Sequence, residues 1–327
     1  ASTRLKTLVV GTLGEMTAHP AAVTQQLRAA GQLSDVSFDE RHRSFASLLA
    51  NDGRYQPHDI GDPRDALAVL QYTGGTTGLP KGAMLTHGNL SAANQQYWLT
   101  CTYGGADLQE GAERFLCVLP PFHIYALSVN MLFGVRLGAT QILHTRFEPK
   151  PILEDLAAKK VSVFPGVPTV YTAINNFPGV EQYDLRALKF CGSGGAPLPV
   201  EVHQRFLQIT GCSLAEGWGM TETSPSGTFS PVKAPQRPGS CGLPMPGIEI
   251  RFAKLDNPDA YAALGDKGEI VIRGPNVMKG YWRAEAATKE AFNADGFMRT
   301  GDVGYMDPDG YIHIVDRTKD MLLCSGF

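Results

Sequence analysis

The sequence has almost no excess charge of either sign. Its 29 Lys and Arg residues are balanced by 32 Asp and Glu, which leaves a formal net charge of −3. A nucleic acid or an anionic membrane is held mainly by a basic surface, so the composition gives no reason to expect either partner. Charged residues make up 19% of the chain and hydrophobic residues 43%, a balance that excludes disorder as the default.

Paired cysteines are also lacking. The six cysteines are scattered, and neither a Cys-x-x-Cys pair nor a Cys/His spacing typical of zinc ligands is present. We therefore expect neither a zinc site nor a disulfide framework, and a reducing, cytoplasmic setting. The apolar run 8–10 is too short for the core of a signal peptide.

One long stretch lacks charge altogether. Residues 115–135 contain no Asp, Glu, Lys or Arg, and 21 residues are enough to span a membrane. Two consecutive prolines interrupt the stretch, however, and His123, Ser128 and Asn130 make it polar for lipid. We predict a strand, a turn and a buried helix here and no transmembrane segment, while peripheral contact with a membrane stays open.

Glycine is present in excess. There are 36 glycines in 327 residues, above the usual share of about 7%, and they cluster beside Thr, Ser and Pro without a collagen period. At about 150 residues per domain, a chain of this length predicts about two domains. The glycine clusters indicate that several open backbone turns are needed.

Short apolar runs alternate with helical patterns between about residues 66 and 216. This alternation is typical of a parallel β-sheet with covering helices, so the fold class is α/β. The predicted strands are 66–72, 114–119, 140–144, 161–164, 188–191 and 213–216, and the predicted helices lie near 124–137, from 149–151 onward and from Pro199 onward.

The pattern changes after about Ser230. Short strands separated by Gly, Pro and Asp turns predict a small antiparallel sheet or β-barrel-like subdomain, with Asp307–Gly310 as a strong turn signal. The predicted strands are 247–253, 269–273, 297–300, 303–306 and 311–315, with one helix at 285–292. The predicted division is 1–230 for the α/β part, 231–316 for the small β part and 317–327 for a final short segment.

The most informative segment, Tyr72–Gly82, follows the first predicted strand. Three glycines and three threonines precede Lys81, and open N–H groups, hydroxyls and an ammonium together suit phosphate oxygens. A Walker-type loop is excluded because two residues separate Gly78 from Lys81 and a glycine follows the lysine. The remaining alternative is a mobile glycine-rich surface turn.

Two further glycine-rich turns, 191–197 and 217–224, follow predicted strands. Ligands of open parallel sheets bind at the carboxyl ends of strands, so all three turns are expected to meet at one crevice. In the third turn, Trp218 offers a flat face for a base, Thr221 a hydroxyl and Glu222 a carboxylate for Mg²⁺. Each feature also has a structural alternative, since Trp218 could be a core residue and Glu222 a helix cap or surface charge.

Together with two later segments, these motifs resemble the adenylate-forming (AMP-binding) superfamily. The segments, in the superfamily's order, are Tyr72–Gly82, Gly217–Glu222, Arg299–Asp302 and Asp316–Asp320. The resemblance extends from about Asp65 to Phe327. The chain is most similar to bacterial medium- and long-chain fatty acyl-CoA synthetases, on the segments Tyr72–Gly78, Pro121–Tyr125, Gly194–Leu198 and Gly219–Pro225.

The resemblance implies the fold of the superfamily's large N-terminal domain and a two-step reaction. A carboxylate attacks the α-phosphate of ATP, pyrophosphate leaves, and the thiol of coenzyme A then displaces AMP from the acyl-adenylate. The attacking groups come from the substrates, which agrees with the absence of a convincing Ser/His/Asp or Cys/His arrangement. Catalysis is expected to rest on positioning and charge stabilisation, with ATP, Mg²⁺ and coenzyme A as cofactor and cosubstrates.

The resemblance also implies roles for single residues. Phosphates would be bound by Thr73, Thr76, Thr77 and Lys81, adenine by Gly194, Gly195, Ala196 and Trp218, the α-phosphate by Thr221, magnesium by Glu222, and ribose by Asp302 and Arg317. His123 would border the carboxylate pocket, although a lone histidine there is more often a core residue. Leu127, Gly166, Val167 and Tyr171 would line the acyl pocket.

Three positions depart from common superfamily patterns. Gly74 stands where many members have Ser, which removes one phosphate donor. Trp218 replaces the more usual Tyr, so that stacking is kept but a phenolic hydrogen bond is lost. Asp316 replaces the Gly of peptide-synthetase domains, which favours the CoA-ligase or luciferase branches.

The ends of the chain depart as well. Members carry a mobile C-terminal domain after a hinge that matches Lys319, and they have more sequence before the phosphate loop. We expect a large-domain fragment that binds nucleotide or acyl-adenylate but turns over poorly alone.

Two alternatives to a fatty acid ligase remain. One is an aryl- or hydroxycinnamate-CoA ligase, and the other is a nucleotide-binding module without turnover. The acyl chain length is not readable, and a homodimer is among the oligomeric states that the resemblance allows.

Overall fold

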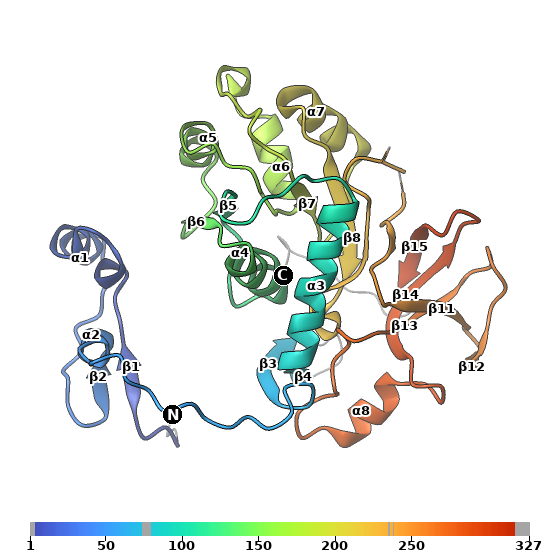
Figure 1. Ribbon diagram of the computed structural model, residues 1–327, viewed down its shortest axis with the longest axis horizontal. Helices are drawn as coiled ribbons and strands as arrows, with labels where there is room; N and C mark the ends of the chain where they lie inside the picture. Colours follow the sequence, from blue (N-terminus) through green and yellow to red (C-terminus); the bar gives the residue numbers. More distant parts are fainter. Residues whose placement is uncertain (1–3, 74–79, 235, 238, 318–327) are drawn as a thin grey trace. The chain divides into compact units, whose positions relative to one another are not determined.

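The computed structural model describes residues 4–73, 80–234, 236–237 and 239–317 (Figure 1). The chain divides into two compact units, Ala1–Asp59 and Ile60–Phe327. No boundary at this point was predicted from the sequence.

The first unit is small and has almost no interior. Its strands β1 (Leu8–Val10) and β2 (His42–Ser44) pair in parallel, and η1 (Leu13–Met16), α1 (Pro20–Ala29) and α2 (Phe45–Leu49) complete it. Pro20 starts α1, where its missing N–H costs nothing, and the Ser44 hydroxyl caps α2 by accepting from the Ser47 amide. Gly14 is the sole buried residue among those described in this unit.

A largely parallel sheet forms the centre of the second unit. β5 pairs in parallel with β6, and β7 pairs in parallel with β8, while single parallel bridges from Val163 to Phe115 and Phe190 join the two pairs. β9 and β10 extend the sheet in antiparallel fashion. The strand bounds are β5 Arg114–Cys117, β6 Thr140–Leu143, β7 Cys191–Ser193, β8 Leu214–Gly219, β9 Ser226–Phe229 and β10 Leu243–Pro244. The parallel α/β prediction is confirmed here, although 161–164 contributes bridges and not a full strand.

The predicted amphipathic helices cover this sheet. α5 (Pro149–Ala158) buries Ile152, Leu153 and Leu156, and α7 (Val200–Thr210) begins directly after Pro199 and buries Phe206. These side chains and those of α6 (Pro168–Asn175) share one hydrophobic core. The 3.6-residue spacing of the apolar positions therefore located both helices correctly.

The uncharged stretch 115–135 forms a strand, a turn and a buried helix, as predicted. After β5 and a turn, the chain enters a π-helical segment, η2 (Ala126–Leu132), which continues into α4 (Phe133–Arg136). Val129 and Phe133 pack with Phe115 in a second core cluster. In the part of the chain that the structure describes, no helix combines the length and the apolar character needed to cross a membrane.

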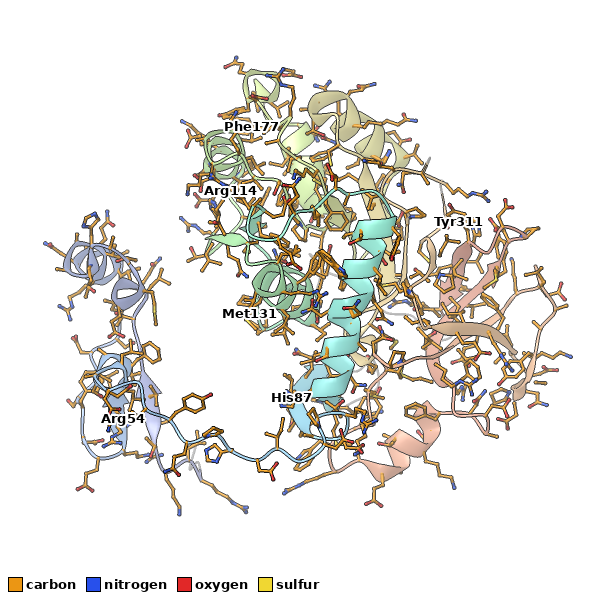
Figure 2. All side chains as sticks on the ribbon, viewed as in Figure 1. Arg54, His87, Arg114, Met131, Phe177 and Tyr311 are labelled. Atoms are coloured by element: carbon orange, nitrogen blue, oxygen red, sulfur yellow. The ribbon has the colours of Figure 1, made fainter. Side chains whose placement is uncertain are left out.

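A β-hairpin precedes this stretch and departs from the prediction. β3 (Leu67–Thr73) pairs antiparallel with β4 (Lys81–Thr86), so the expectation that 66–72 joins the parallel sheet is wrong. Thr86 and Asn89 then cap each other's amides and start the long helix α3 (His87–Tyr103), whose first residue is labelled in Figure 2. The reciprocal cap explains why the strand stops and the helix begins without a loop between them.

The C-terminal part of the described chain is a five-stranded antiparallel sheet. Its order is β12-β11-β13-β14-β15, with bounds β11 Glu249–Lys254, β12 Asn257–Tyr261, β13 Gly268–Arg273, β14 Met298–Met306 and β15 Ile312–Arg317. Figure 1 shows it beside β8, with α8 (Glu285–Ala291) below it in this view. Among the described strands, β12 and β15 are the edges and do not pair with each other. The small subdomain is therefore an open sheet and not a closed barrel.

One strand of this sheet joins two predicted strands. The segments 297–300 and 303–306 are continuous in β14, with Gly301 at φ +77° between them and a register shift against β15 between Val303 and Gly304. The glycine predicts a turn, but the structure uses it inside the strand as an irregularity. The predicted Asp307–Gly310 turn does connect β14 to β15.

Candidate active site

The second and third glycine-rich turns meet at the carboxyl ends of β7 and β8. Ser193 pairs with Glu216 in the parallel register, so the turns that follow leave the sheet side by side. A Cβ placed on Gly194 would lie 3.7 Å from the Gly217 carbonyl oxygen. Gly195 adopts φ +81°, a conformation that side chains rarely tolerate, and with Ala196 it is exposed to solvent. The two turns therefore lie next to each other, as predicted, and the crevice between them stays a prediction.

The first glycine-rich turn connects β3 to β4. Thr73 pairs with Lys81 at the end of the hairpin, which brings the hydroxyl-bearing and the cationic ends of the motif to the same place. Gly74, Thr76 and Thr77 lie outside the described residues. The Gln71 side chain donates a hydrogen bond of 2.6 Å to the Phe122 carbonyl oxygen. This bond connects the hairpin to the turn that contains His123.

Glu222, Tyr281 and Lys81 form a cluster, which we call the Glu222 corner. Glu222 lies in the 3-10 turn η4 (Thr221–Thr223), directly after β8, and is buried with 5% exposure. Its Oε1 accepts a hydrogen bond from the Tyr281 hydroxyl at 2.7 Å, and the Lys81 ammonium lies 5.3 Å from the centre of the Tyr281 ring. The first and the third glycine-rich motifs thus meet at one place, through Lys81 and Glu222.

The electrostatics of this corner favour a cation. Burial raises the pKa of the Glu222 carboxyl, while the Tyr281 hydroxyl and the Lys81 charge act in the opposite direction. Within the described ranges Glu222 has no ion-pair partner. A buried carboxylate that lacks a direct countercharge is stabilised when a cation arrives.

Asp302, Trp218 and Arg317 form a second cluster, the Asp302 corner. Asp302 is 5% exposed and lies in β14, where its Oδ2 accepts from the Trp218 indole N–H at 2.8 Å. Its Oδ1 is 2.7 Å from Nε of Arg317, the neighbouring residue in β15. Burial raises the pKa of Asp302, and Arg317 and Trp218 oppose that rise.

Trp218 links the main sheet to the small sheet. Its indole packs in the core against Ile250, Ile270 and Ile272, and a Cβ on Gly227 of β9 would lie 2.6 Å from the ring. The sequence predicted that Trp in place of Tyr would lose a hydrogen bond, whereas the indole N–H supplies one to Asp302. Only 8% of Trp218 is exposed, so its adenine role stays a prediction.

Glu216 lies beside the candidate site, and the sequence did not indicate it. It is the β8 residue beside the adenine-loop candidates, and its Oε1 accepts from the Leu198 amide at 3.1 Å. Burial raises the pKa of Glu216 to about 7. Tyr281 was missed as well, because a tyrosine after Gly280 carries no spacing or charge signal for a site.

His123 lies in the turn between β5 and η2. Its side chain is exposed by surface area, yet neighbouring atoms surround the ring closely enough to lower the pKa of His123. The Tyr125 amide donates to Nδ1 at 3.2 Å, so the neutral ring carries its proton on Nε2. The imidazole is therefore a neutral donor at pH 7.

The predicted acyl-pocket residues lie on two neighbouring segments. Tyr171 is fully buried, and its hydroxyl lies 2.8 Å from both the Phe164 and the Gly192 carbonyl oxygens, which share its single proton. Gly166 is restricted to a small residue because a Cβ there would lie 3.0 Å from the Tyr171 ring. Val167 caps α6, and the Leu127 amide donates to the His123 carbonyl oxygen. Tyr171 is thus a buried core residue. That Tyr171 and the other three residues line an acyl pocket stays a prediction.

The donor set suits magnesium better than a metal that needs several protein ligands. Over the described part of the chain, no group of three or more His, Cys, Asp or Glu residues could hold a metal ion. Magnesium commonly takes one or two carboxylates, with substrate phosphates and waters as its other ligands. Glu222, close to Lys81 of the β3–β4 hairpin, fits that pattern. The hinge candidate Lys319 lies outside the described residues.

Comparison with known proteins places the chain in a family. A family model described as AMP-binding enzyme matches residues 2–282. The chain is 41% identical over 266 residues to a long-chain-fatty-acid–CoA ligase of Bacillus subtilis. The aligned region covers 81% of this chain and 46% of the ligase. It is 40% identical over 272 residues to a feruloyl-CoA synthase of an Amycolatopsis species, covering 83% of this chain and 53% of that enzyme.

A solved structure shows the same fold. ATP-bound MatB from Rhodopseudomonas palustris superposes with a TM-score of 0.77 at 30% identity, covering 98% of this chain and 61% of that one. The chain spans about half the length of the curated relatives it matches. With the family model matching more than half of the sequence, the chain belongs to the AMP-binding enzyme family.

Proposed function

We propose that the protein activates a fatty acid with ATP, first to an acyl-adenylate and then to an acyl-CoA, with release of pyrophosphate and AMP. The observation that carries the proposal is the short segment between Trp218 and Glu222. Trp218 is hydrogen-bonded to Asp302, and Glu222 follows it four residues later in the chain. This short segment therefore connects the Asp302 carboxylate, which accepts hydrogen bonds, with the Glu222 carboxylate, which lacks a direct countercharge among the described residues. A nucleoside triphosphate needs these two environments at its ribose and phosphate ends.

Each part of the nucleotide has candidate partners in this arrangement. The phosphates would be held by Thr73, Thr76, Thr77 and Lys81, adenine by Gly194, Gly195, Ala196 and Trp218, the α-phosphate by Thr221, and the ribose hydroxyls by Asp302 and Arg317. Glu222 would hold Mg²⁺, which when bound would neutralise phosphate charge. Positioning and charge stabilisation then account for catalysis of the displacement.

No protein nucleophile is required by this reaction. The carboxylate of the substrate attacks the α-phosphorus and pyrophosphate leaves, and the thiolate of coenzyme A then attacks the acyl carbon and AMP leaves. His123 would offer its Nε2 proton to the substrate carboxylate, since its lowered pKa keeps it neutral. The acyl chain would extend toward Leu127, Gly166, Val167 and Tyr171.

A second candidate substrate is a hydroxycinnamate. The similarity to a feruloyl-CoA synthase at 40% identity favours this alternative, while the long-chain fatty acid ligases support the first. Both substrates are carboxylic acids that end in an apolar body, so the two reactions differ in the shape of one pocket.

Binding of stable acyl-adenylate mimics to the purified chain would test the proposal. We expect acylsulfamoyl adenosines to bind at least 10-fold more tightly than AMP, with a palmitoyl or octanoyl mimic preferred over a coumaroyl mimic, as measured by calorimetry. Preference for the coumaroyl mimic would favour the hydroxycinnamate alternative. Failure of all the mimics to exceed AMP would contradict acid activation and leave a nucleotide-binding module.

A further inference from the structure

We propose that Tyr281 positions the Glu222 carboxylate for a divalent cation. The inference rests on the proposed function, since it concerns the metal ion that would accompany ATP. Tyr281 lies in none of the motifs that identify the family in the sequence, and it is 59 residues from Glu222 along the chain.

The hydrogen bond restrains one end of the carboxylate. The Tyr281 hydroxyl donates to Oε1 of Glu222 at 2.7 Å, a distance typical of a strong bond between a hydroxyl and an ionised acceptor. With Oε1 engaged, rotation of the carboxylate is restricted, and we assign Oε2 to the cation. Partners of this kind orient metal ligands and set their basicity.

The tyrosine is suited to this task because it donates without adding charge. A phenol carries its proton throughout the physiological range, so the Tyr281 hydroxyl is available as a neutral donor. A neutral donor orients the carboxylate and leaves its negative charge available. A lysine or arginine in its place would orient Glu222 equally well but would compete with the metal ion.

The backbone around Tyr281 is attached to both sides of the corner. The Met278 amide donates to the Glu222 carbonyl oxygen at 2.8 Å, and the Trp282 amide donates to the Gly82 carbonyl oxygen at 2.8 Å. Tyr281 also forms an antiparallel bridge with Ala83 of β4. The segment 278–282 therefore fixes the distance from the phosphate hairpin to Glu222, and the Tyr281 side chain is carried on it.

The ring of Tyr281 is packed independently of its hydroxyl. It lies 5.3 Å from the Lys81 ammonium and contributes to the core beneath the small sheet. A phenylalanine would keep these contacts and remove only the bond to Glu222. Tyr281→Phe is thus a specific probe of the positioning role.

A matched control is present in β12. The Tyr261 hydroxyl donates to Asp295 Oδ2 at the same distance, 2.7 Å, and neither residue belongs to the Glu222 or the Asp302 corner. Tyr261→Phe therefore removes a tyrosine–carboxylate bond elsewhere in the molecule, together with the bond that the Tyr261 hydroxyl accepts from the Asn293 side chain at 3.2 Å. Any general effect of losing a tyrosine–carboxylate bond will appear in both variants.

The experiment measures ATP binding to the purified chain by calorimetry, once with excess Mg²⁺ and once in EDTA. We expect Tyr281→Phe to weaken binding in Mg²⁺ by about 10-fold or more and to change binding in EDTA by less than twofold. Tyr261→Phe should change neither.

The outcomes separate the inference from the proposed function. If Tyr281→Phe weakens ATP binding equally in Mg²⁺ and in EDTA, the role of Tyr281 is purely structural. If the gain in ATP affinity caused by Mg²⁺ is the same in Tyr281→Phe as in the wild type, the positioning role is contradicted. Either result overturns the inference if the wild-type chain binds ATP more tightly with Mg²⁺ than without. If the wild-type chain shows no Mg²⁺ increment, the metal assignment in the proposed function has failed instead.

Discussion

The Glu222 corner and the Asp302 corner each bury one carboxylate, but they balance its charge differently. Asp302 is paired directly with the Arg317 guanidinium at 2.7 Å and also accepts from the Trp218 indole. Glu222 accepts from the neutral Tyr281 hydroxyl, and its nearest described cation, Lys81, is directed at a ring. The charge of Asp302 is thus neutralised by a direct ion pair within the protein. Among the described residues, the charge of Glu222 has no such partner.

This difference indicates what each corner can bind. A carboxylate already paired with arginine attracts another cation weakly, but it can still accept hydrogen bonds from hydroxyl groups such as those of a ribose. A buried carboxylate without a direct countercharge gains most from a metal ion. The same chemical group, a carboxylate that is equally buried at both positions, is therefore predicted to hold a sugar at one corner and a cation at the other.

Removal of the Glu222 charge should have the largest effect, because it removes the difference in charge balance between the two corners. We expect Glu222→Gln to eliminate the Mg²⁺-dependent part of ATP binding, a loss of about 100-fold or ~2.7 kcal/mol. The unfolding free energy should stay the same or rise, because a buried charge is removed and the amide can still accept from Tyr281. Calorimetry with and without Mg²⁺, together with urea unfolding, would measure both. A variant that keeps the full Mg²⁺ increment would refute the metal assignment.

Removal of the charge of Asp302 should have a smaller effect that does not depend on the metal. Asp302→Asn loses the ion pair with Arg317 but keeps an acceptor for Trp218, so nucleotide affinity should fall about 10-fold equally with Mg²⁺ and in EDTA. Asp309→Asn is the matched control, because it removes a 2.7 Å pair with Arg237 on the surface and should leave binding unchanged. A loss confined to the Mg²⁺ condition would show that the two corners do not divide their roles in this way.

Glu216 is a third carboxylate near the two corners, and it has no cationic partner among the described residues. Its pKa is raised by burial from 4.5 to about 7, so the neutral form stabilises the fold fully below pH 4.5, and that stability is lost as the pH rises toward 7. Glu216→Gln should be more stable than the wild type at pH 8, by up to about 3 kcal/mol, and similar to it at pH 4.5. Urea unfolding at several pH values would measure this difference. A gap that stays constant with pH would exclude titration of Glu216 as its cause.

Local patterns predicted the parts of the fold that depend on local physics. The apolar stripes of α5 and α7, the Pro199 start of α7 and the Asp307–Gly310 turn are all present as expected. The hairpin partner β4 and strand β9 were missed. Gly82 and Gly227 give these strands weak β propensity, and close packing against Tyr72 and Trp218 requires glycine at those positions.

The site could be predicted only in part for a related reason. Lys81, Glu222 and Asp302 are in recognisable motifs, and the structure gives each a place in one of the two corners. Tyr281 and Glu216 act through neighbours that are distant in sequence, and no spacing rule relates them to those neighbours. The charge balance of each corner likewise depends on tertiary contacts, so the sequence alone could not distinguish a paired carboxylate from an unpaired one.

The long sequence separations within the site also have a consequence for folding kinetics. The Trp218–Asp302 bond closes a loop of 84 residues, and the Asn89 side chain reaches the Val277 carbonyl oxygen across 188 residues. Contacts of this kind must overcome loop-closure entropy before they stabilise anything, so they form late and slowly. Helices such as α5 and α7 can form early, whereas the ability to bind a nucleotide is acquired only when the two sheets have docked around Trp218.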